Sequence, residues 1–264
     1  MGTPWDAAAP GYLEQWVPRF LPYHADLVRE LSLRPGDRVL IPSAGPGAEV
    51  LHVARVVGAS GFVRATDRSE VMVALCREQV ERAQVPARIE CELADATRAF
   101  GGPWDAVVCA FGLWQLPSKE DAMRAWAGEL SPGGKVGIIT WGPFEADGPF
   151  ERLRSALHDV APDYPRPHPH LETDRDAMCS LFRRAGLDMV RHTVVRHTLS
   201  FKSAEAFVRA MRDGCTWRRV WEELGEDAFQ RVAARFFDSL GGPHGPLAFD
   251  PPATLAIGTL ARAT

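Results

Sequence analysis

The chain has 264 residues, of which 46% are hydrophobic, 24% charged and 9% aromatic. These fractions are ordinary for a globular protein, so they exclude disordered, collagen-like and coiled-coil classes. Lys and Arg number 30 against 34 Asp and Glu, which gives a net charge of −4. A mildly acidic chain has no global attraction for nucleic acid or anionic lipid.

No apolar run reaches the ~18 residues that a membrane-spanning helix needs, and the first residues lack the basic and apolar segments of a secretory signal. The cysteines form no C-x-x-C pair, which argues against zinc, an iron–sulfur cluster or a disulfide framework; they are Cys76, Cys91, Cys109, Cys179 and Cys215. We therefore expect a reduced, cytoplasmic protein with no metal, no membrane span and no nucleic-acid partner. The oligomeric state is left open.

The chain begins with a predicted helical segment over residues 11–31, interrupted by Pro18 and Pro22, whose aromatic residues recur every three or four positions. We treat residues 1–37 as N-terminal lid helices. Strands and helices then alternate five times, which predicts an α/β fold with a doubly wound, parallel sheet. The strands are predicted at 38–41, 62–66, 88–91, 104–110 and 135–141.

The pattern changes after Trp141, where residues 142–173 are rich in proline. Further helices are predicted at 175–185, 203–213 and 217–240, and further strands at 187–199 and 253–262. We expect the late helices to form a cap inserted over the sheet and the final strand to return to the sheet edge. The proposed division is a ligand-binding core over 38–142, and a cap insertion with C-terminal helices and strands completing the sheet over 143–264.

Two loops at predicted carboxyl ends of strands carry unusual residues. The glycine-containing loop over residues 43–47 follows the first strand, and lets a ligand approach the backbone closely. Asp67 ends the second strand, 22 residues after Gly45, where a carboxylate can accept both hydroxyls of a ribose. Taken singly, the glycines could form only a tight turn, and Asp67 could cap a helix.

The loop is poorly suited to phosphate. Val50 stands where a dinucleotide fingerprint needs its third glycine, no Gly-Lys-Ser/Thr follows, and no loop residue is basic. Arg68 could in principle contact the 2′-phosphate of NADP. Because the loop lacks the glycine spacing of a dinucleotide fingerprint, NADP is nevertheless disfavoured as the ligand. A nucleoside without phosphates fits better, and S-adenosylmethionine is such a ligand.

Several runs together resemble class I S-adenosylmethionine-dependent methyltransferases. They occur in the family's order across about residues 12–141, and are VLIPSAGPGAEV, ATDRSEVMVALCRE, ADA, WDAVVCAFGLWQLP and LSPGGKV. The likeness is strongest to the branch with ubiquinone/menaquinone-biosynthesis C-methyltransferases and tailoring enzymes of secondary metabolism. It implies a Rossmann-like methyltransferase sheet with an inserted helical cap and N-terminal lid helices.

The resemblance also implies roles for particular residues. The loop beneath the methionine part of the cofactor would contain Ser43, Ala44, Gly45 and Gly47. Asp67 would hold the ribose hydroxyls, with Arg68 and Met72 beside the adenine. Asp95 would accept a hydrogen bond from the adenine amino group, and Ala96 would give a backbone contact. Residues near the sulfonium would be Ala110 and Phe111, and the aromatic lid would be Tyr12 and Trp16.

Two positions depart from the family pattern. The family usually has an acidic residue at the place of Ile41, which helps orient the amino-acid end of the cofactor, and a glycine at the place of Ser43. This departure leaves open a protein that binds the cofactor but catalyses another reaction, such as a cyclisation.

Methyl transfer from a sulfonium can proceed mainly through alignment and desolvation, and aromatic faces stabilise the cation. A general base is needed only for a weakly acidic hydroxyl or carbon acceptor, and the candidates are His24 and His168. Trp114 is a candidate wall of the substrate pocket. The aromatic N-terminal helix and proline-rich cap favour a hydrophobic small molecule as the acceptor. The resemblance implies that it is methylated on oxygen or carbon, in secondary metabolism.

Overall fold

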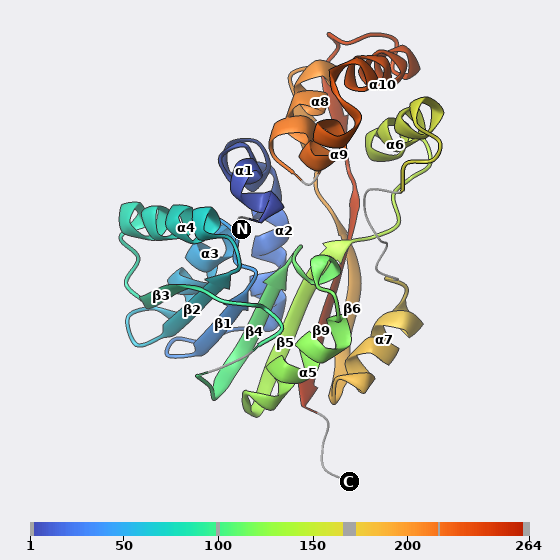
Figure 1. Ribbon diagram of the computed structural model, residues 1–264. Coiled ribbons are helices and arrows are strands. Elements are labelled where there is room, and N and C mark those ends of the chain that lie inside the picture. Colours follow the sequence, from blue (N-terminus) through green and yellow to red (C-terminus); the bar gives the residue numbers. More distant parts are fainter. Residues whose placement is uncertain (1–2, 99–100, 166–172, 216, 261–264) are drawn as a thin grey trace.

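The computed structural model describes residues 3–98, 101–165, 173–215 and 217–260. A seven-stranded sheet forms its centre, in the order β3-β2-β1-β4-β5-β9-β6 (Figure 1). The first five strands in the sequence pair in parallel; they are β1 (Arg38–Pro42), β2 (Phe62–Asp67), β3 (Arg88–Leu93), β4 (Trp104–Ala110) and β5 (Leu130–Trp141). The predicted α/β class and doubly wound, Rossmann-like sheet are confirmed.

The last strand does not lie at the sheet edge, so that prediction is wrong. Strand β9 (Pro252–Leu260) runs antiparallel between β5 and β6 (Leu187–Arg196), and β6 forms the edge. Residues 252–258 of β9 are all buried, whereas buried residues are rare in β6. A strand that is apolar on both faces belongs in the interior of a sheet, and an edge strand tolerates exposed side chains.

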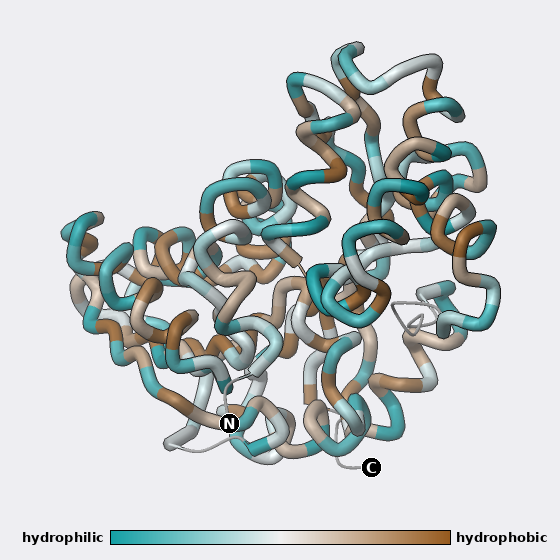
Figure 2. The backbone as a smooth tube through the Cα atoms, turned by 45° about the horizontal axis from the view of Figure 1, so that its top comes forward, coloured by the Kyte–Doolittle hydropathy of each residue, from teal (hydrophilic) through white to brown (hydrophobic). Residues whose placement is uncertain are grey.

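Helices cover both faces of the sheet. One face packs against α2 (Val17–Leu31), α3 (Ala48–Val57) and α4 (Glu70–Ala83), and the other against α5 (Lys119–Gly128) and α7 (Arg175–Arg184). Successive strand residues point to opposite faces, so Val39 and Leu40 belong to two different apolar cores. Figure 2 shows hydrophobic and hydrophilic residues alternating along the surrounding helices, as expected for helices with one buried side.

The N-terminal segment is helical from an earlier residue than predicted. Helix α1 (Pro4–Gly11) continues through a π-helical turn, η1 (Tyr12–Trp16), into α2. The irregular turn occupies residues 12–16, immediately before α2, whereas Pro18 lies within α2 and does not interrupt it. Pro22 is accommodated within the helix.

A helical cap stands beyond the carboxyl ends of the parallel strands (Figure 1). It contains α6 (Pro149–Val160), α8 (Ala204–Asp213), α9 (Trp217–Leu224), α10 (Glu226–Ser239) and a small sheet of β7 (Leu199–Phe201) and β8 (Leu247–Phe249). The single helix predicted over 217–240 is divided at Gly225, whose φ of 82° ends the first helix.

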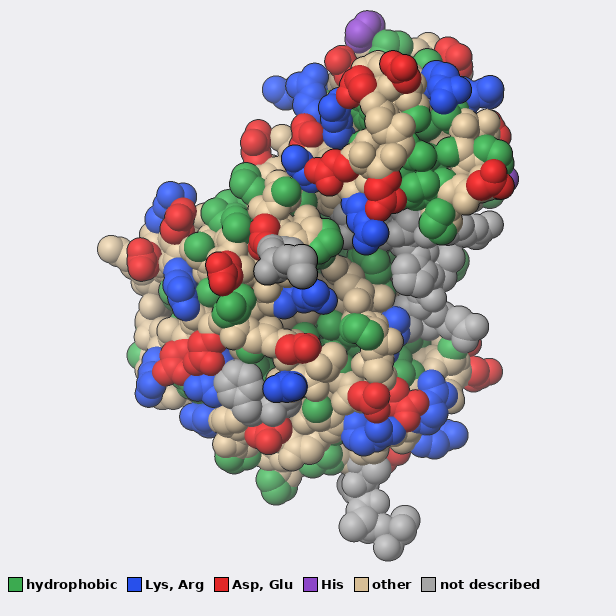
Figure 3. All heavy atoms as spheres, in the orientation of Figure 1, with side chains coloured by type: hydrophobic (Ala, Val, Ile, Leu, Met, Phe, Trp, Pro, Cys, Tyr) green, Lys and Arg blue, Asp and Glu red, His purple; other side chains and the backbone are tan. Residues whose placement is uncertain are grey.

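The outer surface mixes charges of both signs. On the face drawn in Figure 3, acidic and basic side chains are interspersed over the sheet domain and the cap. Among the residues that the structure describes, no helix combines the length and apolar character needed to cross a bilayer.

Candidate functional site

Two strained residues mark the carboxyl ends of neighbouring strands β1 and β4. Ser43 and Phe111 have positive φ angles of 60° and 55°, a conformation that costs a residue with a Cβ about 1–2 kcal/mol. The two loops touch, since a Cβ on Gly112 would lie 2.7 Å from that of Ser43. Such strain is maintained mostly at functional sites, so these loops are the first candidates for one.

The two glycines of the first loop have different surroundings. Gly47 has a φ of 90°, and a Cβ there would lie 2.7 Å from Sγ of Cys76 in α4. Gly45 also has a positive φ, of 52°, but a Cβ there would meet no atom within 4 Å. Gly47 is therefore required for close approach of the loop to α4, whereas Gly45 leaves space open above its backbone.

Asp67 lies directly against this loop. Its carboxylate accepts a hydrogen bond from the Gly45 N–H at 2.9 Å and another from the Ser69 N–H at 3.0 Å. Burial raises the pKa of Asp67, and these backbone donors oppose the shift. Each carboxylate oxygen can accept more than one hydrogen bond, so Asp67 can hold ligand hydroxyls while it fixes the loop.

Glu49 is a site residue that the sequence reasoning missed. It lies in the first turn of α3, only 4% exposed. Burial, followed by the nearby charge of Asp67, raises the pKa of Glu49 to about 8, against a hydrogen bond from its own backbone N–H. A cationic ligand group would favour its ionised form. The signal available in the sequence was an acid two residues after Gly47, immediately before the apolar run of a buried helix.

The loop with the residues predicted to contact the adenine, Asp95 and Ala96, lies beside Asp67. The N–H of Ala94 donates to the carbonyl of Asp67 at 2.9 Å, which holds the loop after β3 next to the end of β2. Asp95 is exposed, and hydrogen bonds from the Thr97 N–H and hydroxyl lower its pKa. The Ala96 carbonyl already accepts from Trp126 Nε1 at 2.8 Å.

The two other residues that were predicted to lie beside the adenine are found near the start of α4. Met72 is buried, and its N–H donates to the Ser69 hydroxyl oxygen at 3.1 Å. Arg68 is exposed at the junction between β2 and α4. Both positions therefore border the loop that contains Asp67.

Helix α1 crosses this region and is fastened at two points. The hydroxyl of Ser69, the N-cap of α4, donates to the carboxylate of Asp6. On the other side, Trp5 Nε1 donates to the side-chain oxygen of Gln115, which follows β4. The helix thus bridges the carboxyl ends of β2 and β4, and its role as a lid stays a prediction.

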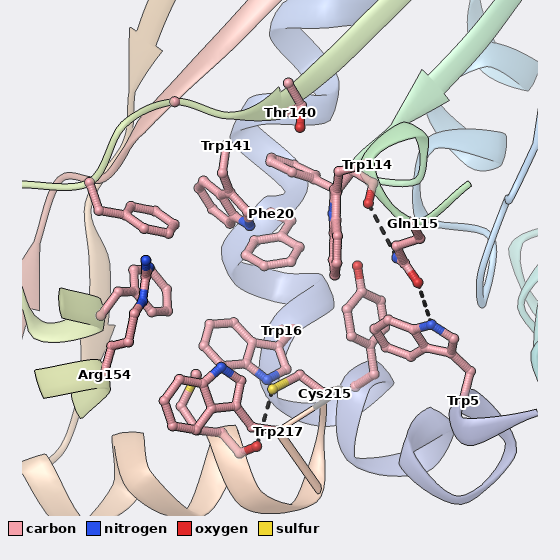
Figure 4. A pocket seen from close by; sticks show the side chains of 16 residues that line it. Trp5, Trp16, Phe20, Trp114, Gln115, Thr140, Trp141, Arg154, Cys215 and Trp217 are labelled. Atoms are coloured by element: carbon pink, nitrogen blue, oxygen red, sulfur yellow. Dashed lines mark hydrogen bonds between the residues drawn. The ribbon is translucent and has the colours of Figure 1, made fainter. Parts of the chain in front are cut away.

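An aromatic pocket opens between α1, η1, α2, the ends of β4 and β5, and the cap (Figure 4). Its cavity volume is about 120 Å³, and it is partly open to solvent. Trp114, the candidate wall of the substrate pocket, lines it together with Tyr12, Trp16 and Phe111, whose predicted roles toward the cofactor stay predictions. The lining residues that sequence reasoning missed are Trp5, Phe20, Gln115, Thr140, Trp141, Gly142, Phe144, Phe150, Arg154, Met211, Cys215 and Trp217.

The pocket offers no ordinary base. Among its described lining residues there is no histidine, aspartate or glutamate. Burial raises the pKa of Cys215 to about 12. The pKa of Tyr12 is also raised, first by burial and then by the charges of Glu49 and Asp67. Tyr12 therefore stays protonated near neutral pH. It lines the pocket and is also close enough to Glu49 and Asp67 for their charges to affect its pKa.

The two predicted catalytic histidines are placed as follows. His24 is 2% exposed in α2, beside Phe20 and Phe111, and does not line the pocket. Both its ring nitrogens lack a hydrogen-bond partner among the described residues, and burial lowers its pKa to about 3. His168 lies outside the described residues. A base role for either stays a prediction.

Comparison with known proteins agrees with this architecture. Residues 39–134 match a methyltransferase domain family. The ubiquinone/menaquinone biosynthesis C-methyltransferase of Azotobacter vinelandii is 34% identical over 134 residues, which are 50% of this chain and 51% of that protein. The chain thus spans about half the length of the curated relatives it matches.

Solved structures extend the likeness in fold to most of the chain. A S-adenosylmethionine-dependent methyltransferase from Aquifex aeolicus aligns with a TM-score of 0.56 and 15% identity, over 90% of this chain and 89% of that one. The [4+2]-cyclase SpnF aligns with a TM-score of 0.61 and 18% identity, over 94% and 84%.

Residues 39–134 thus match a methyltransferase domain family, and the chain has the fold of solved S-adenosylmethionine-dependent methyltransferases. The resemblance found in the sequence is confirmed at the level of domain and fold.

Proposed function

We propose that the protein binds S-adenosylmethionine and transfers its methyl group to a hydrophobic small molecule. The observation that carries this proposal is one junction: Phe111, directly after β4, has a strained conformation and also lines the aromatic pocket. A ligand lying along the loops of β1 and β2 would therefore present its reactive end to this aromatic pocket.

The residues present fit this cofactor. The loop has no cation for a phosphate, open space lies above Gly45, and Asp67 has acceptor capacity for ribose hydroxyls. Glu49 supplies a buried carboxyl close to Asp67, from a different element than the acid that the family usually has at the place of Ile41. We propose that Glu49 faces the ammonium of the methionine part, because a nearby cation stabilises its ionised form.

When bound, the cofactor would supply a methyl group activated by positively charged sulfur. The aromatic residues of this chain would exclude water and hold the acceptor in line, and alignment alone accounts for a large part of the rate in such displacements. Rings such as those of Tyr12 and Phe111 would stabilise a cation by about 0.5–2 kcal/mol each. With no base among the described lining residues, the best acceptor is one that needs little help to lose its proton, which then passes to water.

The name of one relative bears on the acceptor atom. The Azotobacter relative is named for C-methylation in ubiquinone/menaquinone biosynthesis, which favours carbon over oxygen as the acceptor atom. A role in secondary metabolism and a cytoplasmic location stay predictions from the sequence.

Binding of the cofactor is tested by calorimetry with Asp67→Ala. Loss of hydrogen bonds to a charged acceptor should weaken S-adenosylmethionine binding about 10-fold to 100-fold. Asp163→Ala, which removes an exposed acid outside the site, is the control and should bind normally. Unchanged affinity in Asp67→Ala, or no binding to the unaltered protein, refutes the assignment.

A cyclisation is the second candidate function, and the absence of a base among the described lining residues favours it. Such a reaction needs a shaped apolar pocket and no proton transfer, and the cofactor would then have a structural role. Incubation with methyl-labelled S-adenosylmethionine and candidate acceptors separates the two. Label in a product establishes methyl transfer, whereas an unlabelled, rearranged product supports cyclisation.

A further inference from the structure

Two of the five free cysteines are in contact. Cys76 lies on α4 and Cys91 on β3, and their Sγ atoms are 3.4 Å apart. The sulfur atoms of a disulfide are about 2.05 Å apart, so an approach of about 1.4 Å would bring this pair to bonding distance. Neither cysteine lines the aromatic pocket, and the proposed function uses neither thiol.

The two thiols differ in exposure and in acidity. Cys91 is partly exposed, so a small molecule in solution can reach it, whereas Cys76 is 1% exposed. A hydrogen bond from the Cys76 thiol lowers the pKa of Cys91, and the charge of Arg77 lowers it further, against burial and the charge of Glu92. The same hydrogen bond, together with burial, raises the pKa of Cys76. Because the thiolate is the nucleophile, Cys91 is the sulfur that reacts first and Cys76 the one that follows.

Cys76 also supports the loop that contains the proposed cofactor site. An added Cβ on Gly47 would lie 2.7 Å from Sγ of Cys76 and 3.4 Å from its Cα, so the loop backbone packs directly on this cysteine. Cys91 pairs with Ala65 of β2, two residues before Asp67, whose carboxylate accepts a hydrogen bond from the same loop. A bond between the two sulfur atoms would draw Sγ of Cys76 toward β3, and would change the packing under the loop.

We propose that Cys76 and Cys91 form a modification site, which a peroxide oxidises to a reversible disulfide, and that this disulfide weakens ligand binding at the loop of Gly47. That the weakened ligand is S-adenosylmethionine rests on the proposed function, whereas formation of the disulfide does not.

The oxidation has two steps. The Cys91 thiolate attacks one peroxide oxygen, the O–O bond breaks, and the other oxygen takes a proton and leaves as water or an alcohol, so that Cys91 becomes a sulfenic acid. The Cys76 thiol then attacks the sulfur of Cys91, the S–S bond forms and the S–O bond breaks, and the departing hydroxide takes the thiol proton to form water. The two sulfur atoms together lose two electrons, which the peroxide gains.

Mass spectrometry tests the disulfide without any cofactor. The reduced protein is treated with hydrogen peroxide, its remaining thiols are alkylated, and it is digested. We expect a pair of peptides joined through Cys76 and Cys91, lighter by two hydrogen atoms than the same pair in its reduced form, and separated again by dithiothreitol. If the two cysteines are found only in separate peptides after peroxide treatment, the proposal is overturned, whether or not any variant folds.

Variants test the order in which the two sulfur atoms react. In Cys76→Ala the sulfenic acid of Cys91 has no thiol to react with, so dimedone should label it several-fold more than in the unaltered protein. In Cys91→Ala peroxide should leave Cys76 unmodified, because Cys76 is buried. The control is Cys179→Ala, which removes a partly exposed cysteine of α7 and should leave the linked peptides unchanged. Equal dimedone labelling of Cys76→Ala and the unaltered protein would contradict the second step.

Two measurements test the effect on the loop. Calorimetry should show S-adenosylmethionine bound at least about 10-fold more weakly by the oxidised form than by the reduced form, with recovery after dithiothreitol and no effect of peroxide on Cys91→Ala. Hydrogen exchange of the Gly47 N–H, which donates to the Ala44 carbonyl at 3.0 Å, should be faster in the oxidised form.

Equal affinity of the reduced and oxidised forms overturns the coupling between the disulfide and the loop. If neither form binds S-adenosylmethionine, the proposed function fails, and hydrogen exchange then decides the coupling by itself, because it needs no cofactor. Equal exchange in the two forms would in that case overturn it.

Discussion

Gly45 and Gly47 lie two residues apart in one loop, but their surroundings predict different consequences of substitution. At Gly45 an added Cβ meets nothing within 4 Å, and at Gly47 it meets Sγ of Cys76 at 2.7 Å. Both positions also have positive φ, so either substitution costs about 1–2 kcal/mol of backbone strain.

Gly47→Ala should therefore reduce the free energy of unfolding by more than Gly45→Ala does, because overpacking adds about 1–3 kcal/mol. Chemical denaturation measures both. Adding Cys76→Ala to Gly47→Ala should recover part of the loss, since the contacting sulfur is removed. Equal losses in the two single variants would contradict this view of the loop.

Gly45→Ala should instead weaken S-adenosylmethionine binding, because its methyl group enters the space above the loop. Calorimetry on the folded variant should show a loss of about 10-fold or more, as expected when a close backbone approach is blocked. Gly133→Ala, another position with positive φ and open space, is the matched control for strain without a ligand. Normal affinity in Gly45→Ala would place the cofactor elsewhere.

The buried His24 should make the free energy of unfolding decrease as the solution becomes more acidic. Its folded pKa of about 3 lies below the ordinary value, so between about pH 6.5 and pH 3 the unfolded chain binds a proton that the folded protein does not. The contribution of neutral His24 to the free energy of unfolding is fully present above pH 6.5. It falls by about 1.4 kcal/mol for each pH unit below that value.

His24→Leu should remove this fall. Urea unfolding at pH 7, 6, 5 and 4 should show the variant gaining stability relative to the unaltered protein as pH decreases. The exposed His244, changed to Gln, should give a curve parallel to that of the unaltered protein. If the His24→Leu curve is also parallel, the imidazole is not buried in solution.

At the scale of elements, α1 connects two halves of the site through side-chain hydrogen bonds. Asp6 binds the N-cap of α4, and Trp5 binds Gln115 after β4. Because α1 crosses the region where the proposed cofactor would lie, it has to open for exchange. Each of these two hydrogen bonds can be removed by a single substitution, which tests its contribution to opening.

Trp5→Phe keeps the ring but removes the donor to Gln115. We expect the dissociation rate of S-adenosylmethionine in stopped-flow fluorescence to increase several-fold, with a smaller change in the free energy of unfolding, because one neutral hydrogen bond contributes about 0.5–1.5 kcal/mol. Trp104→Phe, which alters a buried tryptophan at the start of β4 whose Nε1 has no hydrogen-bond partner among the described residues, is the control. An unchanged dissociation rate would show that α1 is not the lid.

At the scale of the whole molecule, the sheet and the cap share one apolar core. The same cluster contains Val39 of β1, Phe20 of α2 and Phe207 of α8. A ligand that binds among these elements should therefore stabilise the whole fold.

Thermal unfolding should show this coupling. At a concentration 100 times its dissociation constant, S-adenosylmethionine should add about 2.7 kcal/mol of stability, which for a chain of this size is roughly 5–10 °C in Tm. Asp67→Ala at the same concentration should show a smaller shift. Two transitions, of which only one responds to ligand, would contradict a single cooperative unit.

Much of the fold could be predicted because its signals are local. The apolar runs that form β1, β2, β4 and β5 are bounded by turn residues, and alternation with helices requires a parallel sheet. The location of β9 between β5 and β6 could not be predicted in this way. It depends on which of two late strands is buried on both faces, and that is settled by long-range pairing.

The sequence by itself determined the methyltransferase resemblance and the loop of Gly45 with Asp67, because these residues act through backbone geometry and short spacing. Only the tertiary structure showed that Glu49 is buried beside Asp67 and that Arg154 reaches an aromatic pocket. Those side chains lie on separate helices, and the burial that gives a carboxyl or a guanidinium its chemistry comes from residues distant in the chain.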